Sequence, residues 1–329
     1  MNIYITLDYE LFFGPESGSV DDCIIKPTEA LLEIVDPYNI KIVFFVDVGY
    51  LIKLKEYQSR YPELHSDYQK VTKQIKQLSQ AGHAIELHIH PHWENTVYNG
   101  DKWVFDTIKY KLSDFSKPEA HKIVLKYSAF LKEISGKSPI AFRAGGWSAQ
   151  PFEHIKEALK EANIIIDSTV YPKGYHVSKN QRYDFRNVPQ YKTKYRFNDN
   201  LTVEDSKGYF IEYPISSYRV SPFFFWRFAF NKFKKSKQHV SFGKGRAIPK
   251  PRKELLRLMT RYSNTVVSID GFKASFINKA FKNYQKNTKQ EGHFVLIGHP
   301  KAFTPYSLNK TKAFIAKQHM NNNFYIFKK

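Results

Sequence analysis

The feature that most limits what this chain can fold into is the recurrence of short apolar runs rich in β-branched and aromatic residues. Each run is bounded by turn-forming or polar residues, which is the pattern of a short buried strand. The sequence therefore predicts seven strands. They cover residues 3–7, 42–46, 84–88, 140–142, 164–167, 210–213 and 294–298.

Helical patterns lie between these runs, over residues 67–81, 118–134 and 151–162. Strands that alternate with helices predict a mostly parallel sheet, and seven such strands predict an α/β fold of the distorted (β/α) barrel type. The chain has 329 residues, of which 42% are hydrophobic, and it shows no internal repeat. We therefore expect a single barrel domain over residues 1–329.

Polar residues stand at the ends of several predicted strands. In a (β/α) barrel the catalytic groups lie at the carboxyl ends of the strands, so these residues are expected to converge. They are Asp8 and Glu10 after the first run, His88, His90 and His92 at the third, Arg143 at the fourth, Asp167 at the fifth and His299 at the seventh.

Two of these groups predict a metal centre. Asp8 and Glu10 are two residues apart, so a strand directs both carboxylates to one face. The three histidines alternate within five residues, and neutral imidazole is the commonest ligand of zinc and its neighbours. Two histidines and one carboxylate form an open catalytic site and leave the second carboxylate as a base. We expect Zn²⁺, or another divalent transition metal such as Co²⁺ or Ni²⁺.

Five segments between residues 6 and 300 carry a family resemblance. They read Thr-Leu-Asp-Tyr-Glu at 6–10, His-Ile-His-Pro-His at 88–92, Arg-Ala-Gly-Gly-Trp at 143–147, Asp-Ser-Thr-Val-Tyr-Pro at 167–172 and Leu-Ile-Gly-His-Pro at 296–300. In this order they resemble the motifs of the polysaccharide deacetylases with a NodB-homology domain, the fourth carbohydrate esterase family. The first segment is similar to the Asp-X-Asp or Asp-X-Glu variant of that family's first motif.

The resemblance implies a role for each residue near the metal. Glu10, His88 and His92 would bind the ion, Asp8 would be the general base, and Arg143 would hold Asp8 ionised. The usual first motif has adjacent aspartates. Because Tyr9 occupies the second place here, the metal role passes to Glu10.

The later motifs imply the remaining groups. His299 would be the general acid, with Asp167 as the partner that keeps it protonated, although the fourth motif lacks its usual tryptophan. Backbone N–H groups at Gly146 and Trp147 would bind the developing oxyanion, in a turn where Gly145 opens a Gly-Gly-Trp sequence in place of the common Pro-Tyr.

These implied roles predict a metal-dependent hydrolase that removes acetyl from an N-acetylated sugar, in a glycan or glycan precursor of a bacterial surface polysaccharide. Two alternatives remain open. A pairing of His88 with His90 would resemble the His-X-His sites of metal-dependent amidohydrolases and phosphoesterases. The barrel could also be catalytically inactive and bind a glycan or a lipid.

The charge is concentrated in one part of the chain. The formal net charge is +20, and residues 221–261 hold twelve Lys and Arg side chains against the single acid Glu254. Within this basic aromatic insertion, near 221–250, residues 223–235 interleave aromatic rings with cations. That composition is typical of a segment in a membrane interface, so we expect 221–237 to contact anionic membranes. A buried aromatic insertion with a solvated basic edge is the competing interpretation.

Nucleic acid is the other anionic partner that this charge could serve. The sequence carries no nucleic-acid-binding signature, and the paired acids Asp8 and Glu10 would repel a phosphate backbone. The opening residues contain no secretory signal pattern, and Cys23 has no second cysteine to pair with. We therefore expect a cytoplasmic location, with peripheral contact at the inner face of the membrane.

Overall fold

The computed structural model describes residues 1–233, 236–247, 252–288 and 292–328. In these ranges seven mutually parallel strands form a continuous curved sheet, and they coincide with all seven predicted runs, which confirms the expected fold class. In spatial order they are β11 (Phe210–Glu212), β7 (Ile166–Asp167), β6 (Ala141–Ala144), β3 (Ala84–Ile89), β2 (Val43–Asp47), β1 (Asn2–Tyr9) and β14 (His293–Gly298). β10 (Tyr195–Phe197) extends the β11 edge antiparallel, and β15 (Asn323–Phe324) lies parallel to β1.

Irregular backbone hydrogen bonds connect the two ends of this sheet. Ile215 N–H donates to Val170 O after β7, and Ser216 N–H donates to Val295 O on β14, at 2.8 and 2.9 Å. Val267 N–H donates to Ser216 O at 2.7 Å. The sheet is therefore curled into a distorted barrel rather than left open.

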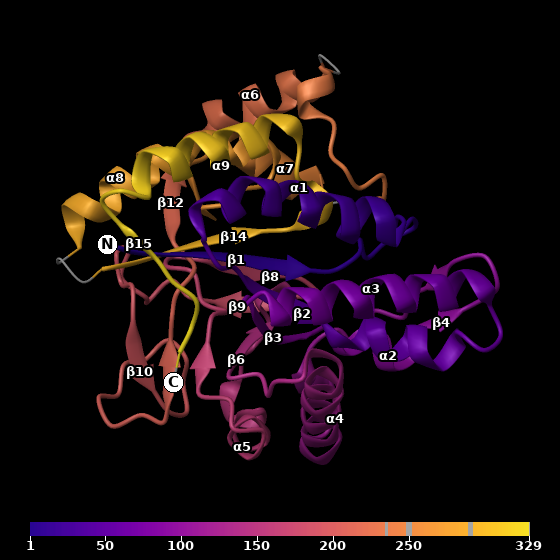
Figure 1. Ribbon diagram of the computed structural model, residues 1–329. Coiled ribbons are helices and arrows are strands. Elements are labelled where there is room, and N and C mark those ends of the chain that lie inside the picture. Colours follow the sequence, from indigo (N-terminus) through magenta and orange to yellow (C-terminus); the bar gives the residue numbers. More distant parts are fainter. Residues whose placement is uncertain (234–235, 248–251, 289–291, 329) are drawn as a thin grey trace.

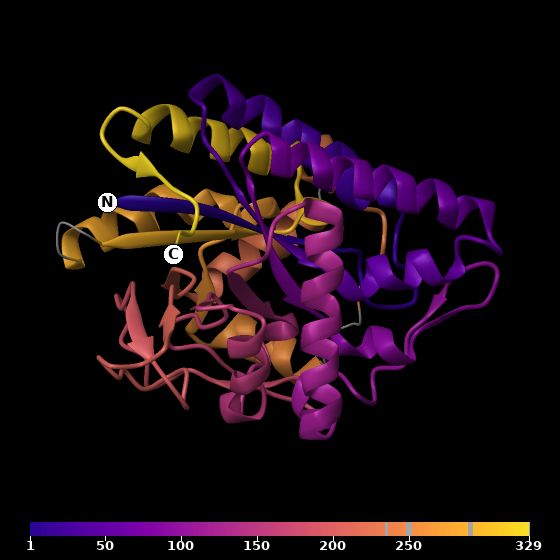
Figure 2. The same cartoon turned by 60° about the horizontal axis from the view of Figure 1, so that its bottom comes forward.

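Helices surround the outside of the sheet (Figures 1 and 2). In Figure 1, α1 and α9 lie above β1 and β14, whereas α4 and α5 lie at the opposite side. The helices that cover the sheet are α1 (Lys26–Val35), α2 (Val48–Tyr57), α3 (Pro62–Gln80), α4 (Lys117–Ser135), α5 (Lys156–Glu161), α8 (Ile277–Asn287) and α9 (Pro305–Gln318).

Sequence signals set the ends of α4. The Ser116 hydroxyl accepts from the backbone N–H of Glu119, and the Glu119 carboxylate accepts from Ser116 N–H at 2.8 Å, which forms a capping box. Gly136 ends the helix in a left-handed conformation with φ 74°. α5 is shorter than the predicted 151–162, because residues 152–154 form a 3₁₀ turn before it begins.

Strand alternation separates two apolar layers. On β1 the odd-numbered residues Ile3, Ile5 and Leu7 pack outward beneath the helices. The other face forms a smaller cluster inside the barrel, made of Tyr4, Val43, Phe45, Ala84, Ala141, Ile166, Tyr213, Val295 and Phe327. This apolar floor fills the amino-terminal end of the barrel, so the polar residues of the same face lie at its carboxyl-terminal mouth.

The basic aromatic insertion leaves the barrel between two paired strands. β12 (Ser217–Val220) and β13 (Ser263–Val266) are antiparallel neighbours, and the chain between them contains α6 (Pro222–Phe233) and α7 (Arg252–Thr260). Two further hairpins extend from the barrel: β4 (Val97–Tyr98) with β5 (Trp103–Val104), and β8 (Tyr175–Val177) with β9 (Arg182–Asp184).

Candidate active site

The polar groups at the barrel mouth belong to the same strand faces as the apolar floor. On β1, Asp8 follows Tyr4 on the inward face at even spacing, and Glu10 lies one residue beyond the strand's end. On β3, His88 follows the inward residue Ala84 in the same way. Arg143 is two residues after the inward Ala141 on β6. Parallel strands end at the same edge, so these side chains meet.

Asp8 and Arg143 form a buried ion pair. Arg143 Nη1 donates to Asp8 Oδ1 at 2.6 Å, and the arginine side chain is fully buried. Its other N–H groups donate to Ser168 O at 2.7 Å and to Thr6 Oγ1 at 2.9 Å, and its guanidinium stacks over the ring of Phe45. Burial would raise the pKa of Asp8, but the charge of the Arg143 guanidinium holds it well below its usual range. Asp8 is therefore ionised at neutral pH.

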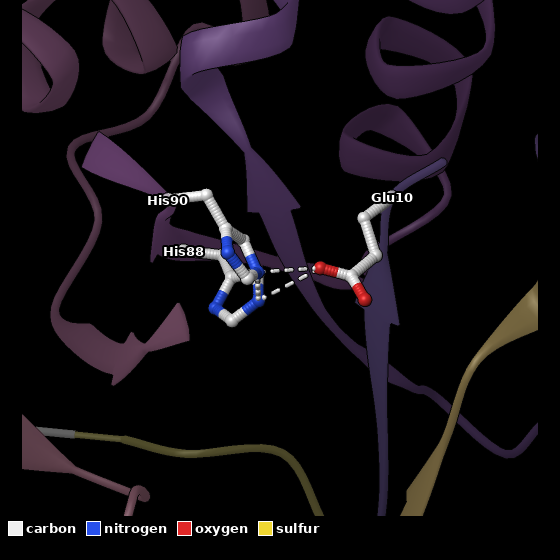
Figure 3. A group of neighbouring side chains, drawn as sticks. All are labelled: Glu10, His88 and His90. Atoms are coloured by element: carbon white, nitrogen blue, oxygen red, sulfur yellow. Dashed lines mark hydrogen bonds and ion pairs between the residues drawn. The ribbon is translucent and has the colours of Figure 1, made fainter. Parts of the chain in front are cut away.

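Glu10, His88 and His90 direct one atom each to a common point (Figure 3). Glu10 Oε2 lies 3.2 Å from His88 Nε2 and 2.7 Å from His90 Nε2, and the two Nε2 atoms are 3.1 Å apart. All three side chains are buried.

Two neighbouring bonds fix the orientation of these donors. His88 Nδ1–H donates to the carbonyl oxygen of Arg143 at 2.8 Å, which leaves Nε2 directed at Glu10. The Lys301 ammonium donates to Glu10 Oε1 at 2.9 Å, which leaves Oε2 directed at the histidines. Such outer bonds commonly orient metal ligands.

The donor set fits a divalent transition metal. Two imidazole nitrogens and one carboxylate oxygen are the three ligands typical of a catalytic zinc site. Burial lowers the pKa of His90 to about 4, so its ring is neutral at neutral pH, which is the form that binds a metal. His90 Nδ1 is buried and has no hydrogen-bond partner among the described residues. The polar contacts of this ring are those of Nε2 with Glu10 and His88.

His92 lies outside this group. Its backbone belongs to the 3₁₀ helix Pro91–Asn95, which starts directly after His90, so the strand alternation that aligns His88 with His90 ends there. The His92 ring stacks on Tyr110 with an interplanar angle of 4° and on Trp93. Neither ring nitrogen has a hydrogen-bond partner in the described structure. The resemblance implies His92 as the second histidine, whereas the geometry places His90 beside Glu10 and His88.

His299 faces the site from the end of β14. Its Nε2 lies 3.5 Å from Asp8 Oδ2 and 4.0 Å from Glu10 Oε1. On its other side Nδ1 is 2.8 Å from Asp270 Oδ2, and Asp270 Oδ1 accepts the His299 backbone N–H at 2.7 Å. Burial lowers the pKa of His299, but the charges and hydrogen bonds of Asp270 and Asp8 raise it to about 10. His299 is therefore a cation at neutral pH.

Asp167 does not pair with His299, which corrects that expectation. Ile166 faces into the barrel, so alternation turns the next residue, Asp167, to the outer face. There its carboxylate accepts from Thr169 N–H at 2.8 Å and from Thr169 Oγ1 at 3.0 Å, beside Glu212. The position that the resemblance assigns to Asp167 is occupied by Asp270.

The Gly-Gly-Trp turn packs directly against the site. A Cβ at Gly145 would lie 2.5 Å from His90 Nδ1 and 2.7 Å from Ile89 O, so only glycine leaves room for the His90 ring. Gly146 and Trp147 both have positive φ, 58° and 57°, and Gly146 O accepts from Gln181 Nε2 at 2.6 Å. The backbone of Gly146 and Trp147 is thus held at the mouth.

We expect Gly145→Ala to displace His90. Overpacking at a buried contact costs about 1–3 kcal/mol of unfolding free energy, because neither Ile89 O nor the ring can move freely. Urea unfolding measures this loss. Gly136→Ala is a suitable control, since a Cβ there meets no atom within 4 Å and the cost comes only from its positive φ. Unchanged metal affinity and stability in Gly145→Ala would contradict the close packing.

Sequence reasoning missed two residues of this site. Asp270 follows residues 266–269, three of which are apolar, and Ser268 among them forms a parallel bridge to Ile297 of β14. The rule that polar residues at strand ends line the mouth would have found Asp270 if that stretch had been included. Lys301 is two residues after His299 and lies just beyond the motif at 296–300, so no motif singled it out.

No protein-family model and no curated protein matches this sequence. Several solved structures are similar, among them a protein from Mycobacterium smegmatis described as a polysaccharide deacetylase (18% identity, TM-score 0.46, 99% of this chain and 86% of that one). Another is a polysaccharide deacetylase from Bacillus cereus (14% identity, TM-score 0.41, 99% of this chain and 92% of that one). A third is an allantoinase (12% identity, TM-score 0.48, 100% of this chain and 87% of that one). These similarities do not distinguish one activity from another.

Proposed function

We propose that this protein is a metal-dependent deacetylase that hydrolyses the N-acetyl amide of a sugar. The observation that carries the proposal is the convergence of Glu10, His88 and His90 beside an ionised Asp8 and a protonated His299. The order of the five motifs along the chain supports the same family of reactions. On that resemblance, the substrate is a glycan or glycan precursor of a bacterial surface polysaccharide.

The groups at the mouth divide into an acid and a base. A divalent cation, when bound to Glu10, His88 and His90, supplies Lewis acidity toward the acetyl carbonyl and lowers the pKa of water. Asp8 takes the proton of the attacking water, and Arg143 keeps the carboxylate ionised and fixed for that transfer.

His299 acts on the leaving group. The water oxygen bonds to the acetyl carbon, the C–N bond breaks, and His299 donates its proton to the sugar nitrogen, so that acetate and a free amine leave. Asp270 orients the imidazolium and stabilises its charge. In this mechanism the backbone N–H groups of Gly146 and Trp147, in the turn beside His90, stabilise the oxyanion.

Acetate release and metal content test the proposal together. Purified protein is analysed for bound metal, stripped with a chelator, reloaded with Zn²⁺, Co²⁺ or Ni²⁺, and incubated with N-acetylglucosamine oligomers. We expect acetate release only from the metal-loaded protein. A metal-loaded protein that releases no acetate from any N-acetylated sugar would contradict the deacetylase assignment.

The adjacent His88 and His90 donors favour a second candidate, a metal-dependent amidohydrolase or phosphoesterase. The same donor set could serve a cyclic amide or a phosphodiester, since the metal polarises either group. A panel that adds these two substrate classes separates the candidates. Cleavage of a non-sugar amide or a phosphodiester, without release of acetate from sugars, would favour the second.

We expect Asp270→Asn to narrow the pH range of activity from the alkaline side. His299, the general acid, must be protonated to act. The carboxylate of Asp270 is the leading cause that raises the pKa of His299 to about 10. Without that charge the pKa falls, so the alkaline limb of the profile moves to lower pH. The pH dependence of kcat measures the shift. Asp167→Asn, whose carboxylate is on the outer face, should leave that limb in place, and an equal shift in both variants would contradict the pairing.

A further inference from the structure

Helix α6 exposes one aromatic stripe. Phe223, Trp226, Phe230 and Phe233 follow one another at helical spacing, and their exposed fractions are 68%, 56%, 59% and 84%. Large aromatic side chains are rarely left in water in this number on one face. Figure 1 places α6 at the top edge of the molecule, outside α9 and far from α4 and α5.

The opposite face of α6 anchors the helix to the barrel. Phe224 is buried, stacks on Phe272 and contacts Phe276 at a centroid distance of 5.0 Å. Trp226 Nε1–H donates to Met259 O of α7 at 3.0 Å, which ties the two helices together. The competing interpretation, a buried aromatic insertion with a solvated basic edge, therefore holds for Phe224 but not for the exposed stripe.

Basic residues flank this stripe. Exposed cations near it are Arg227 on α6, Lys237 after it, Arg252, Lys253 and Arg257 on α7, and Arg261 beyond it. Helix α7 adds Leu255 and Leu256 to the apolar surface, 46% and 65% exposed. Lys234 and Lys235 lie outside the described residues, and the Lys232 side chain is not described.

We propose that the α6–α7 pair is a docking surface for a bilayer that contains anionic lipid. The exposed aromatic rings enter the interfacial region, and the surrounding cations meet the lipid phosphates and carboxylates. No helix in the described part of the chain is long and apolar enough to cross a membrane. α6 has 12 residues, about 18 Å of helix, so it lies along the surface.

The connection between the two helices passes the barrel mouth. Gly243 N–H donates to Lys301 O, whose ammonium holds Glu10, and Arg246 N–H donates to Glu16 O in the segment after β1. Gly243 and Arg246, which lie between α6 and α7 in the sequence, are thus hydrogen-bonded to the segments that follow β14 and β1.

Co-sedimentation of the full chain with vesicles tests the proposal. The vesicles contain phosphatidylcholine alone or with about one third phosphatidylglycerol. We expect binding to the anionic vesicles and binding about tenfold weaker or more in Phe223→Ser/Phe233→Ser. Both side chains are largely solvent-exposed, so this variant should keep its fold, which thermal unfolding checks. The matched control is Ile108→Ser/Val177→Ser, which removes two exposed apolar side chains elsewhere and should bind as the wild type does.

A second pair of variants tests the charge. Arg252→Gln/Lys253→Gln/Arg261→Gln should weaken binding to anionic vesicles, whereas Lys73→Gln/Lys76→Gln/Lys122→Gln, on α3 and α4, removes equal charge far from α6 and should not. Raising salt from 0.1 to 1 M shortens the Debye length from about 10 to about 3 Å, so wild-type binding should fall but persist. Equal binding by both variants of either pair, or no binding to anionic vesicles, overturns the proposal. Loss of a dimer in Phe223→Ser/Phe233→Ser without vesicle binding would instead assign the surface to a second copy of the chain.

Discussion

Replacement of Asp8 by Asn is expected to lower kcat by about 10²- to 10⁴-fold while the metal remains bound. An amide has nearly the shape of the carboxylate and can still accept the hydrogen bond from Arg143 Nη1, but it cannot take a proton from water. Asp8 is not one of the three grouped donors, and its Oδ2 lies 3.9 Å from His88 Nε2, beyond hydrogen-bond distance. The measurement is single-substrate kinetics together with metal analysis of the same preparation.

A control separates the loss of the base from disturbance of Arg143. Thr6→Val removes the hydrogen bond from Arg143 Nη2 to Thr6 Oγ1, at 2.9 Å, and leaves the carboxylate of Asp8 intact. We expect Thr6→Val to reduce kcat far less than Asp8→Asn does. Loss of metal from Asp8→Asn would make Asp8 a ligand, and full activity in that variant would remove it from the reaction.

The strands of the barrel were well predicted from the sequence, because they are short, fully buried and separated from one another by polar turns. The run at 42–46 predicts β2 (Val43–Asp47) to within one residue at each end, since both of its faces are apolar. β12 and β13 were not predicted, because their sequences, Ser-Tyr-Arg-Val and Ser-Asn-Thr-Val, lack a continuous apolar run. Their pairing is a tertiary contact between segments more than forty residues apart.

The site was only partly predictable, because a side chain's direction depends on the alternation along its strand and on the residue at which the strand ends. Asp167 stands at a strand end, but its inward neighbour Ile166 turns it outward. Asp270 follows residues 266–269, which contact β14 through an isolated bridge and not as a regular strand, so this stretch was not among the predicted strands. His90 and His92 differ by whether the strand or the 3₁₀ helix sets their direction, which the residue types alone do not decide.

That difference leads to the most direct test of the metal centre. The substitution His90→Ala should lower metal affinity by more than about 100-fold. Loss of a residue that only hydrogen-bonds a ligand already lowers metal affinity about 10- to 100-fold, and His90 would be a direct ligand. His92→Phe should retain the metal, since the ring is stacked between aromatic side chains and neither nitrogen has a hydrogen-bond partner in the described structure. Phenylalanine is somewhat larger than histidine, so this variant removes the nitrogens without opening a cavity, at the cost of some overpacking.

Metal content measured by elemental analysis and by competition with a chelator gives the answer without a substrate. The thermal midpoint with and without chelator adds a second readout, because a metal that binds only the folded state raises that midpoint. We expect the chelator to lower the midpoint of the wild type and of His92→Phe, and to leave that of His90→Ala unchanged. The reverse pattern, with metal lost in His92→Phe and kept in His90→Ala, would show that Glu10 and His88 bind the ion with His92. The aromatic pocket around His92 would then have to open when the metal binds.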